Sequence, residues 1–156
     1  AETLGTSRAF RGPLRHRRCI LPASSFIEWT PVDGHRQPWL IRPERGAIAF
    51  AGLWDVWEKE GNHLESCAII TTDAAPGIDR LHNRMPVMLR ERDFARWLDV
   101  DTPLGDPSDI LHSRLPHPFV LAPVSPAVNN SRHKSEALLA PVGEEERVEA
   151  VGQWAK

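Results

Sequence analysis

The chain contains 156 residues, 41% of them hydrophobic, and carries a formal net charge of −2 at pH 7. This length and apolar content are typical of one domain with a single sizeable core. They exclude a membrane-spanning helix, because no run of roughly 18 apolar residues occurs, and the first ten residues lack the apolar core of a signal peptide. The sequence predicts a soluble, cytoplasmic protein without a membrane partner.

Charged and sulfur-containing residues narrow the functional classes further. Five arginines crowd the start and are candidate phosphate contacts, namely Arg8, Arg11, Arg15, Arg17 and Arg18. The two cysteines, Cys19 and Cys67, are far apart and form no C-x-x-C pair, which argues against a zinc site or a disulfide framework. A reducing compartment is expected.

The first half of the chain predicts a meander-like sheet. Residues 18–30 form two short strands separated by Pro22 and an Ala-Ser-Ser step, and Asp33-Gly34 supplies a hairpin turn. Three more strands are expected over residues 37–43, 46–57 and 65–72, the last two separated by turn formers at residues 60–62.

The second half predicts short helices and one late strand. Pro76 begins a short helix that continues to Leu81. The stretch "RERDFARWLDV" (residues 90–100) predicts a second helix with Phe94, Trp97 and Leu98 on one apolar face that packs on the sheet. Residues 101–113 are expected to be irregular, and residues 117–130 offer strand material. A last helix is expected from residue 144, with Val148, Val151 and Trp154 on one face.

Glu28 is the first candidate for chemistry, because it stands between Ile27 and Trp29 in an apolar run. If the carboxylate is desolvated, its pKa rises toward neutrality and it can act as a general acid or base. The alternative is an ordinary carboxylate on the solvent face of an alternating strand.

The stretch "RLHNRMPVML" (residues 80–89) supplies two further candidates. His82 can titrate near neutral pH, and Arg84 can bind a phosphate through its planar guanidinium group. Residues Val87 to Leu89 are apolar and are predicted to lie in the core. The alternatives are a capping or surface histidine and an isolated surface arginine. The remaining histidines show no metal-ligand spacing, so no metal is expected.

Cys19 and the tryptophans have two interpretations each. Arg17 and Arg18 could lower the pKa of the Cys19 thiol, but the following Ile20 and Leu21 favour a small buried hydrophobe. Tryptophans can stack on bases, yet four of the six lie in apolar runs that indicate core: Trp39, Trp54, Trp57 and Trp97.

Four ordered blocks cover most of the chain and together resemble one known family. They are "RRCILPASSFIEW", "IAFAGLWDVW", "IITTDAAPGIDRLHNRMPVML" and "VSPAVN". In the same order they resemble the signature blocks of the SRAP family, the SOS-response-associated peptidase or abasic-site processing proteins. The resemblance implies an α+β fold with a mainly antiparallel, partly closed, barrel-like sheet flanked by short helices.

The resemblance also implies a reaction and its residues. In the family an N-terminal cysteine traps the ring-opened aldehyde of an abasic site in single-stranded DNA as a stable thiazolidine crosslink. The assisting glutamate and histidine match Glu28 and His82, a sugar-orienting position matches Thr71, and a phosphate contact matches Arg84. No cofactor is implied. The expected partner is single-stranded DNA that contains abasic sites, the protein is expected to be a monomer, and it would associate with the nucleoid if its source is prokaryotic.

Two departures qualify the resemblance. "AET" at residues 1–3 matches the tail of the family's N-A-R-x-E-T block, so residues 1–156 are expected to form a single SRAP domain that lacks the N-terminal portion with the nucleophilic cysteine. Ser25 and Ile27 replace the commoner glycine and aromatic residue before Glu28 and Trp29.

Three functions therefore compete. The first is an enzyme-like protein that crosslinks to abasic sites, with the chain as given inactive because Ala1 has no thiol. The second is a non-covalent module that binds single-stranded DNA. The third is a peptidase that removes residues ahead of the cysteine, with Glu28 and His82 in acid-base roles.

Overall fold

The computed structural model describes residues 1–151 and shows a mixed α/β fold of antiparallel sheets with few helices. The elements, in chain order, are α1 (Arg8–His16), β1 (Arg18–Ala23), β2 (Phe26–Val32), β3 (His35–Pro43), β4 (Ile48–Lys59), β5 (Asn62–Ile69), β6 (Thr71–Asp73), β7 (Arg84–Pro86), η1 (Glu91–Asp93), α2 (Phe94–Leu98), β8 (Phe119–Pro123), η2 (Pro126–Asn129), η3 (Glu136–Leu139) and β9 (Glu146–Val148).

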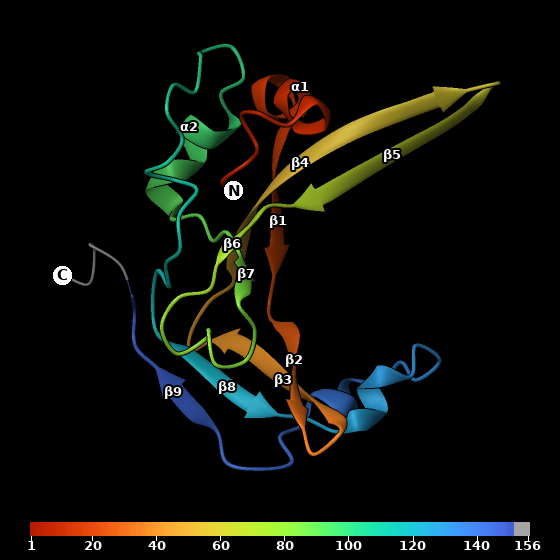
Figure 1. Ribbon diagram of the computed structural model, residues 1–156, viewed down its shortest axis with the longest axis vertical. Helices are drawn as coiled ribbons and strands as arrows, with labels where there is room; N and C mark the ends of the chain where they lie inside the picture. Colours follow the sequence, from red (N-terminus) through yellow and green to blue (C-terminus); the bar gives the residue numbers. More distant parts are fainter. Residues whose placement is uncertain (152–156) are drawn as a thin grey trace.

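The strands form three sheets rather than the single meander that the sequence predicts. The orders are β1-β4-β5, β2-β3-β8-β9 and β6-β7 (Figure 1). The expected strand over residues 65–72 divides at Ile70, and the consecutive strands β3 and β4 belong to different sheets. The meander was wrong because β1 pairs with β4 and β3 with β8, and such long-range pairings leave no local pattern. The expected barrel-like closure is not confirmed, since the sheets of residues 1–151 stay open.

The two predicted turns do join hairpins. Asp33 and Gly34 have φ values of 46° and 79°, and Glu60 and Gly61 have 52° and 80°. Each pair lies between strands that are directly in register, as in a two-residue hairpin with both central residues left-handed.

The outer part of the β4–β5 hairpin projects from the body of the protein as an arm (Figure 1). Every residue of β5 is exposed, and Trp54 and Trp57 on β4 are 39% and 51% exposed. The prediction that these two tryptophans lie in the core is therefore wrong, because no second layer covers the arm within the described residues. Trp97 is fully buried and Trp39 is partly buried.

The core prediction for the end of "RLHNRMPVML" is confirmed. Val87, Met88 and Leu89 are at most 4% exposed. Their segment runs beside β4, where Ala51 N–H donates to Val87 O and Leu89 N–H donates to Ala49 O. This places the preceding residues 82–84 at the edge of the core.

The helix predictions are confirmed in part. α2 forms as expected, although Leu98 is exposed and the buried face carries Phe94 and Trp97. Residues 76–81 form successive turns rather than a helix, because Gly77 has a φ of 92° that a helix cannot contain.

The expected C-terminal helix is also wrong. Residues 146–148 form β9, where Val148 pairs with Phe119 of β8 and packs on the core, so long-range pairing overrides the local helical pattern. Trp154 lies outside the described residues. α1, which was not predicted, contains Gly12 and Pro13, two residues that weaken the helical signal.

Two of the five clustered arginines serve the fold. Arg18 is buried and donates to the carbonyl oxygens of Leu14 and Arg15 at 2.8 and 3.1 Å, which caps the end of α1. Arg17 forms an ion pair with Asp55. Because it is buried, Arg18 is unsuited to contact phosphate, whereas the Arg17 side chain stays at the surface beside Asp55.

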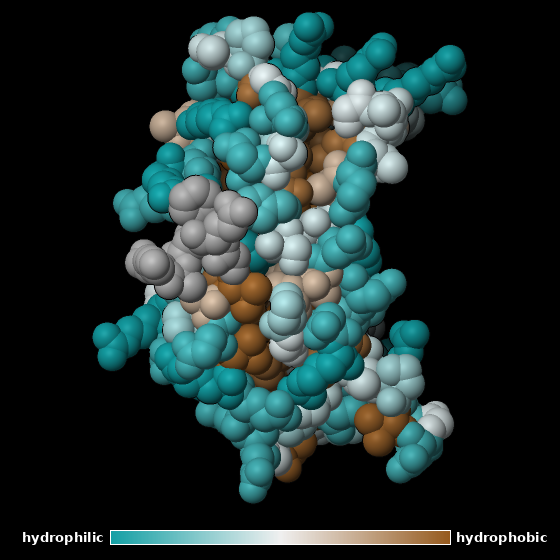
Figure 2. Space-filling view, turned by 60° about the vertical axis from the view of Figure 1, so that its left-hand side comes forward, coloured by the Kyte–Doolittle hydropathy of each residue, from teal (hydrophilic) through white to brown (hydrophobic). Residues whose placement is uncertain are grey.

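The surface on the side of α2 and β9 is largely hydrophilic, with hydrophobic side chains showing between the polar ones (Figure 2). Among residues 1–151, no helix combines the length and the apolar character needed to cross a bilayer.

Candidate active site

The small β6–β7 pair lies between the two larger sheets and carries two of the four predicted site residues (Figure 1). Thr71 opposes Pro86 in the antiparallel register, and Asp73 opposes Arg84. Directly opposed residues of opposite charge attract each other across a strand pair. The pairing therefore explains why Arg84 and Thr71, which are distant in the sequence, meet.

Arg84 is the centre of a dense hydrogen-bond network. Its guanidinium donates to both carboxylate oxygens of Glu2 at 3.0 and 2.9 Å, to Asp73 Oδ1 at 2.8 Å and to Thr71 O at 2.8 Å. The hydrogen bond with Arg84 holds the pKa of Glu2 far below its ordinary value, and Glu2 in turn raises the pKa of Arg84. Ala1 N also donates to Thr71 O, so the first residues of the chain lie against this network.

His82 lies in the turn just before β7 and is exposed. Its Nδ1 lies 3.0 Å from both the main-chain N and the carbonyl O of Arg84. In the neutral ring Nδ1 accepts from the N–H, which leaves the proton on Nε2, and in the charged ring Nδ1 donates to the carbonyl. Both protonation states of His82 therefore have a main-chain partner.

Glu28 lies in the middle of β2, where it pairs with Trp39 of β3 and is partly buried. Burial raises the pKa of the Glu28 carboxyl, and the nearby charge of His82 partly opposes this shift. The structure thus favours the desolvated alternative for Glu28 over an ordinary solvent-facing carboxylate. It also brings Glu28 within electrostatic reach of His82.

Neighbours of Glu28 hold β2 in place against the rest of the site. Thr30 Oγ1 donates to the carbonyl of Leu81, the residue before His82, at 3.3 Å. Trp29 Nε1 donates to Oδ1 of Asn129, at the end of η2, at 2.6 Å. Both bonds hold the part of β2 that directly follows Glu28.

Sequence reasoning assigned no role to Glu2, Asp73 or Asn129. Glu2 and Asn129 do lie within blocks that carry the family resemblance, "AET" and "VSPAVN", and that position was the available signal. Asp73 carried no signal, because its contact with Arg84 depends on strand pairing.

Cys19 is partly buried, and burial raises the pKa of its thiol. The alternative of an activated thiolate is therefore wrong, and the small-hydrophobe interpretation stands. Among residues 1–151 no three side chains of His, Cys, Asp or Glu gather in a way that could hold a metal ion.

Sequence comparison identifies relatives along almost the whole chain. The profile of the SOS response associated peptidase (SRAP) family matches residues 1–131. The abasic site processing protein YoqW of Bacillus subtilis is 37% identical over 147 residues, which cover 89% of this chain and 64% of YoqW. The abasic site processing protein HMCES of Rattus norvegicus is 32% identical over 174 residues, which cover 90% of this chain and 48% of HMCES. The chain thus spans about half to just under two thirds of the length of these relatives.

Solved structures show the same fold. A protein from Bacteroides thetaiotaomicron superposes with a TM-score of 0.81 at 22% identity, over 90% of this chain and 63% of that one. A protein from Bordetella bronchiseptica superposes with a TM-score of 0.68 at 28% identity, over 80% of this chain and 63% of that one. The mixed, mostly antiparallel architecture is therefore shared with experimentally determined structures.

Proposed function

From the premise that this chain belongs to the SRAP family, which its match over residues 1–131 shows, we propose that it processes abasic sites in single-stranded DNA. The names of its relatives YoqW and HMCES support abasic sites as the target. The observation that carries the proposal is the coupling of Glu28 and His82, a partly desolvated carboxylate and an imidazole that two separate segments bring together.

The proposed reaction forms a thiazolidine with an N-terminal cysteine placed ahead of Ala1. The amine nitrogen attacks C1′ of the open sugar aldehyde, the carbinolamine loses water to give an imine, and the thiol sulfur adds to the imine carbon. One C–N and one C–S bond form, and the carbonyl oxygen leaves as water. Each step moves a proton, so one acid and one base suffice.

Glu28 suits the amine side of this reaction. An ammonium group is not nucleophilic, and a carboxylate with a raised pKa is a better proton acceptor than an ordinary one. A glutamate in this strand can therefore deprotonate the attacking amine.

His82 suits the oxygen side. With Nδ1–H donating to the Arg84 carbonyl, the charged ring can give its Nε2 proton to the sugar ring oxygen as the C1′–O bond of the ring breaks and the C1′ hydroxyl loses its proton to a base, which leaves a neutral imidazole. The same group serves as the acid and base of the reverse reaction, because each step is reversible.

Thr71 and Arg84 are the proposed DNA contacts. Arg84 already binds two carboxylates, so a phosphate would have to displace Glu2 or Asp73 from the guanidinium. Arg8, Arg11 and Arg15 on α1 are exposed and form no ion pair within residues 1–151, which supports them as further phosphate contacts. This observation also favours a second candidate function, non-covalent binding of single-stranded DNA.

The test is incubation of an abasic single-stranded oligonucleotide with two proteins, residues 1–156 and the complete gene product that contains them. A heat-stable adduct on a denaturing gel is expected only with a protein that begins with cysteine, because Ala1 supplies an amine without a thiol. An adduct of equal stability with residues 1–156 would overturn the thiazolidine mechanism. Retention of DNA without any adduct from either protein would favour the non-covalent module.

A further inference from the structure

The loop between β6 and β7, which carries His82, extends to the sheet formed by β2, β3, β8 and β9 (Figure 1). Ile78 and Leu81 of this loop are buried in the core that the sheet helps to form. Directly opposed residues of an antiparallel pair project to the same face of a sheet, as do residues two apart in one strand. The register therefore places on one face Glu28 of β2, Trp39 of β3, Leu121 of β8, and Glu146 and Val148 of β9.

Two contacts attach the loop to β9, at one edge of this sheet. Arg80 Nη2 donates to Glu146 Oε2 at 2.6 Å. The backbone at Gly77 also approaches β9 so closely that a Cβ added there would lie 2.7 Å from Val148 Cγ1. The hydrogen bond from Thr30 holds the loop at the other edge, on β2. The loop is thus attached to both edge strands of the sheet.

Arg80 has a third contact, which leads to Glu28. Its guanidinium lies over the ring of Trp39, 4.9 Å from the ring centroid, within the range of a cation–π interaction. Trp39 is the direct cross-strand partner of Glu28. Because Arg80 stands two residues before His82, it links the segment that carries the imidazole to the strand beside the carboxylate.

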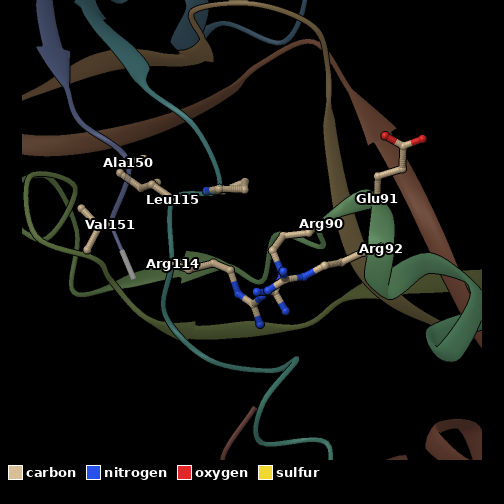
Figure 3. Close-up of a pocket in the computed structure, with 8 residues that line it drawn as sticks. Arg90, Glu91, Arg92, Arg114, Leu115, Ala150 and Val151 are labelled. Carbon is tan, nitrogen blue, oxygen red and sulfur yellow. The ribbon is translucent and has the colours of Figure 1, made fainter. Parts of the chain in front are cut away.

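The segment that supplies Glu146 is itself held in place. β9 pairs with β8 over its whole length. Beyond β9, Val151 N–H donates to Leu115 O at 3.1 Å and Leu115 N–H donates to Val151 O at 2.9 Å, and both residues line the pocket drawn in Figure 3. Glu146 lies outside residues 1–131, so the family profile does not include this contact of Arg80.

We propose that Arg80 is a positioning residue, which holds His82 in place relative to Glu28 through its contacts with Trp39 and Glu146. This inference rests on the proposed function of the pair. A displacement of about 1 Å can cost roughly 10²-fold in rate, whereas an exposed ion pair adds little to stability. The side chains of Arg80 and Glu146 are 40% and 49% exposed, so loss of their contact should affect the reaction rate more than the melting temperature.

The first test measures single-turnover crosslinking of an abasic oligonucleotide by the complete gene product that contains residues 1–156. Arg80→Gln should lower the rate at saturating DNA by roughly 10-fold, less than the loss of a general acid, and should leave the half-saturating DNA concentration unchanged. Arg80→Lys keeps a cation that can contact both Glu146 and Trp39, so it should restore part of the rate.

Glu146→Gln tests the same contact from its other side. It should slow the reaction, and the double variant should be no slower than Arg80→Gln alone, because both changes break one contact. In a His82→Ala background Arg80→Gln should have no further effect, since Arg80 acts through His82. The matched control is Glu145→Gln, which removes a neighbouring carboxylate that binds Arg42 of β3 at 3.1 and 3.3 Å, and it should react as the wild type does.

The outcomes separate this inference from the proposed function. A wild-type rate for Arg80→Gln, beside a slow His82→Ala, would overturn the positioning role alone. If Arg80→Gln raised the half-saturating DNA concentration at an unchanged maximal rate, Arg80 would be a phosphate contact and the inference would be wrong. If Glu28→Gln and His82→Ala also reacted as the wild type does, the proposed function itself would fail.

The second test needs no crosslinking. Nuclear magnetic resonance of residues 1–156 follows the signals of the His82 imidazole. Glu146→Gln should shift these signals, although the hydrogen bond that it removes is to Arg80, and Glu145→Gln should leave them in place. Unchanged His82 signals in Glu146→Gln would overturn the inference even if no variant formed an adduct.

Discussion

The main-chain N–H of Arg84 lies 3.0 Å from Nδ1 of His82, and the carbonyl of the same arginine lies at the same distance. The arginine thus orients the imidazole through its backbone while its guanidinium binds Glu2 and Asp73. One residue therefore connects the proposed proton donor to the first residues of the chain.

Glu28→Gln should slow crosslink formation by roughly 10²-fold in a protein that carries the proposed N-terminal cysteine, because glutamine keeps the shape but cannot accept a proton. The final adduct should still appear, since the amine deprotonates more slowly in water. A time course on an abasic oligonucleotide measures this effect, and a rate equal to wild type would return Glu28 to the role of an ordinary strand carboxylate.

His82→Ala should slow both formation and reversal, because the same group donates the proton in one direction and accepts it in the other. Reversal is measured by isolating the adduct and chasing it with unlabelled abasic trap. A variant that formed the adduct slowly but released it at the wild-type rate would exclude His82 from the sugar-oxygen role.

Glu28→Gln should also raise the melting temperature near pH 7 to 8. The pKa of Glu28 is raised in the folded state, so ionisation disfavours folding and the wild type loses stability as the pH rises through that pKa. The difference in melting temperature should shrink as the pH falls toward 4.5, the ordinary pKa of a glutamate. Below that pH the Glu28 carboxyl of the wild type is protonated in both the folded and the unfolded state. Melting curves at several pH values test this, and a pH-independent difference would argue against desolvation of the carboxylate.

Glu2→Gln should have the opposite effect on stability. The hydrogen bond with Arg84 lowers the pKa of Glu2 in the folded state, so its contribution is present above the ordinary value of 4.5 and is lost as the pH falls through the folded pKa. At pH 7 the melting temperature of the variant should be lower than that of the wild type, and this difference should disappear at acidic pH. Glu144→Gln, at an exposed position, is the matched control and should melt as wild type does. If Glu2→Gln and the wild type had equal melting temperatures at pH 7, the Glu2–Arg84 ion pair would be too exposed to solvent to stabilise the fold.

Substitution of the α1 arginines should reduce the salt dependence of DNA binding. Each phosphate contact to a single strand contributes about 0.7 to the slope of log affinity against log salt, so Arg8→Gln, Arg11→Gln and Arg15→Gln should each lower the slope by up to that amount. Binding should favour single-stranded over duplex DNA. The control is Arg36→Gln, at an exposed arginine near the tip of the β2–β3 hairpin, and it should leave the slope unchanged. Fluorescence anisotropy at four salt concentrations measures the slopes, and three unchanged slopes would remove α1 from the DNA surface.

Local patterns determined the features that depend on neighbours in the sequence. The Asp33-Gly34 and Glu60-Gly61 turns, α2 and the buried run from Val87 to Leu89 follow from backbone preference and apolar content, and the structure contains all of them. The ordered motif blocks predicted the family for the same reason, because residue types at fixed spacings can be recognised in a sequence without knowledge of the fold.

Tertiary structure alone decided what depends on distant pairings. The pairing of β6 with β7 joins Arg84 to Asp73, and the hydrogen bond from Thr30 to Leu81 holds β2 beside the turn that carries His82, where Glu28 is partly buried. Trp54 and Trp57 have the same apolar neighbours as a core tryptophan, yet they are exposed because nothing in residues 1–151 packs on the arm that carries them. β9 forms where the local pattern favours a helix, since Val148 gains more from pairing with β8 and packing on the core. Burial and strand partners are properties of the whole chain, so no local stretch of sequence could specify them.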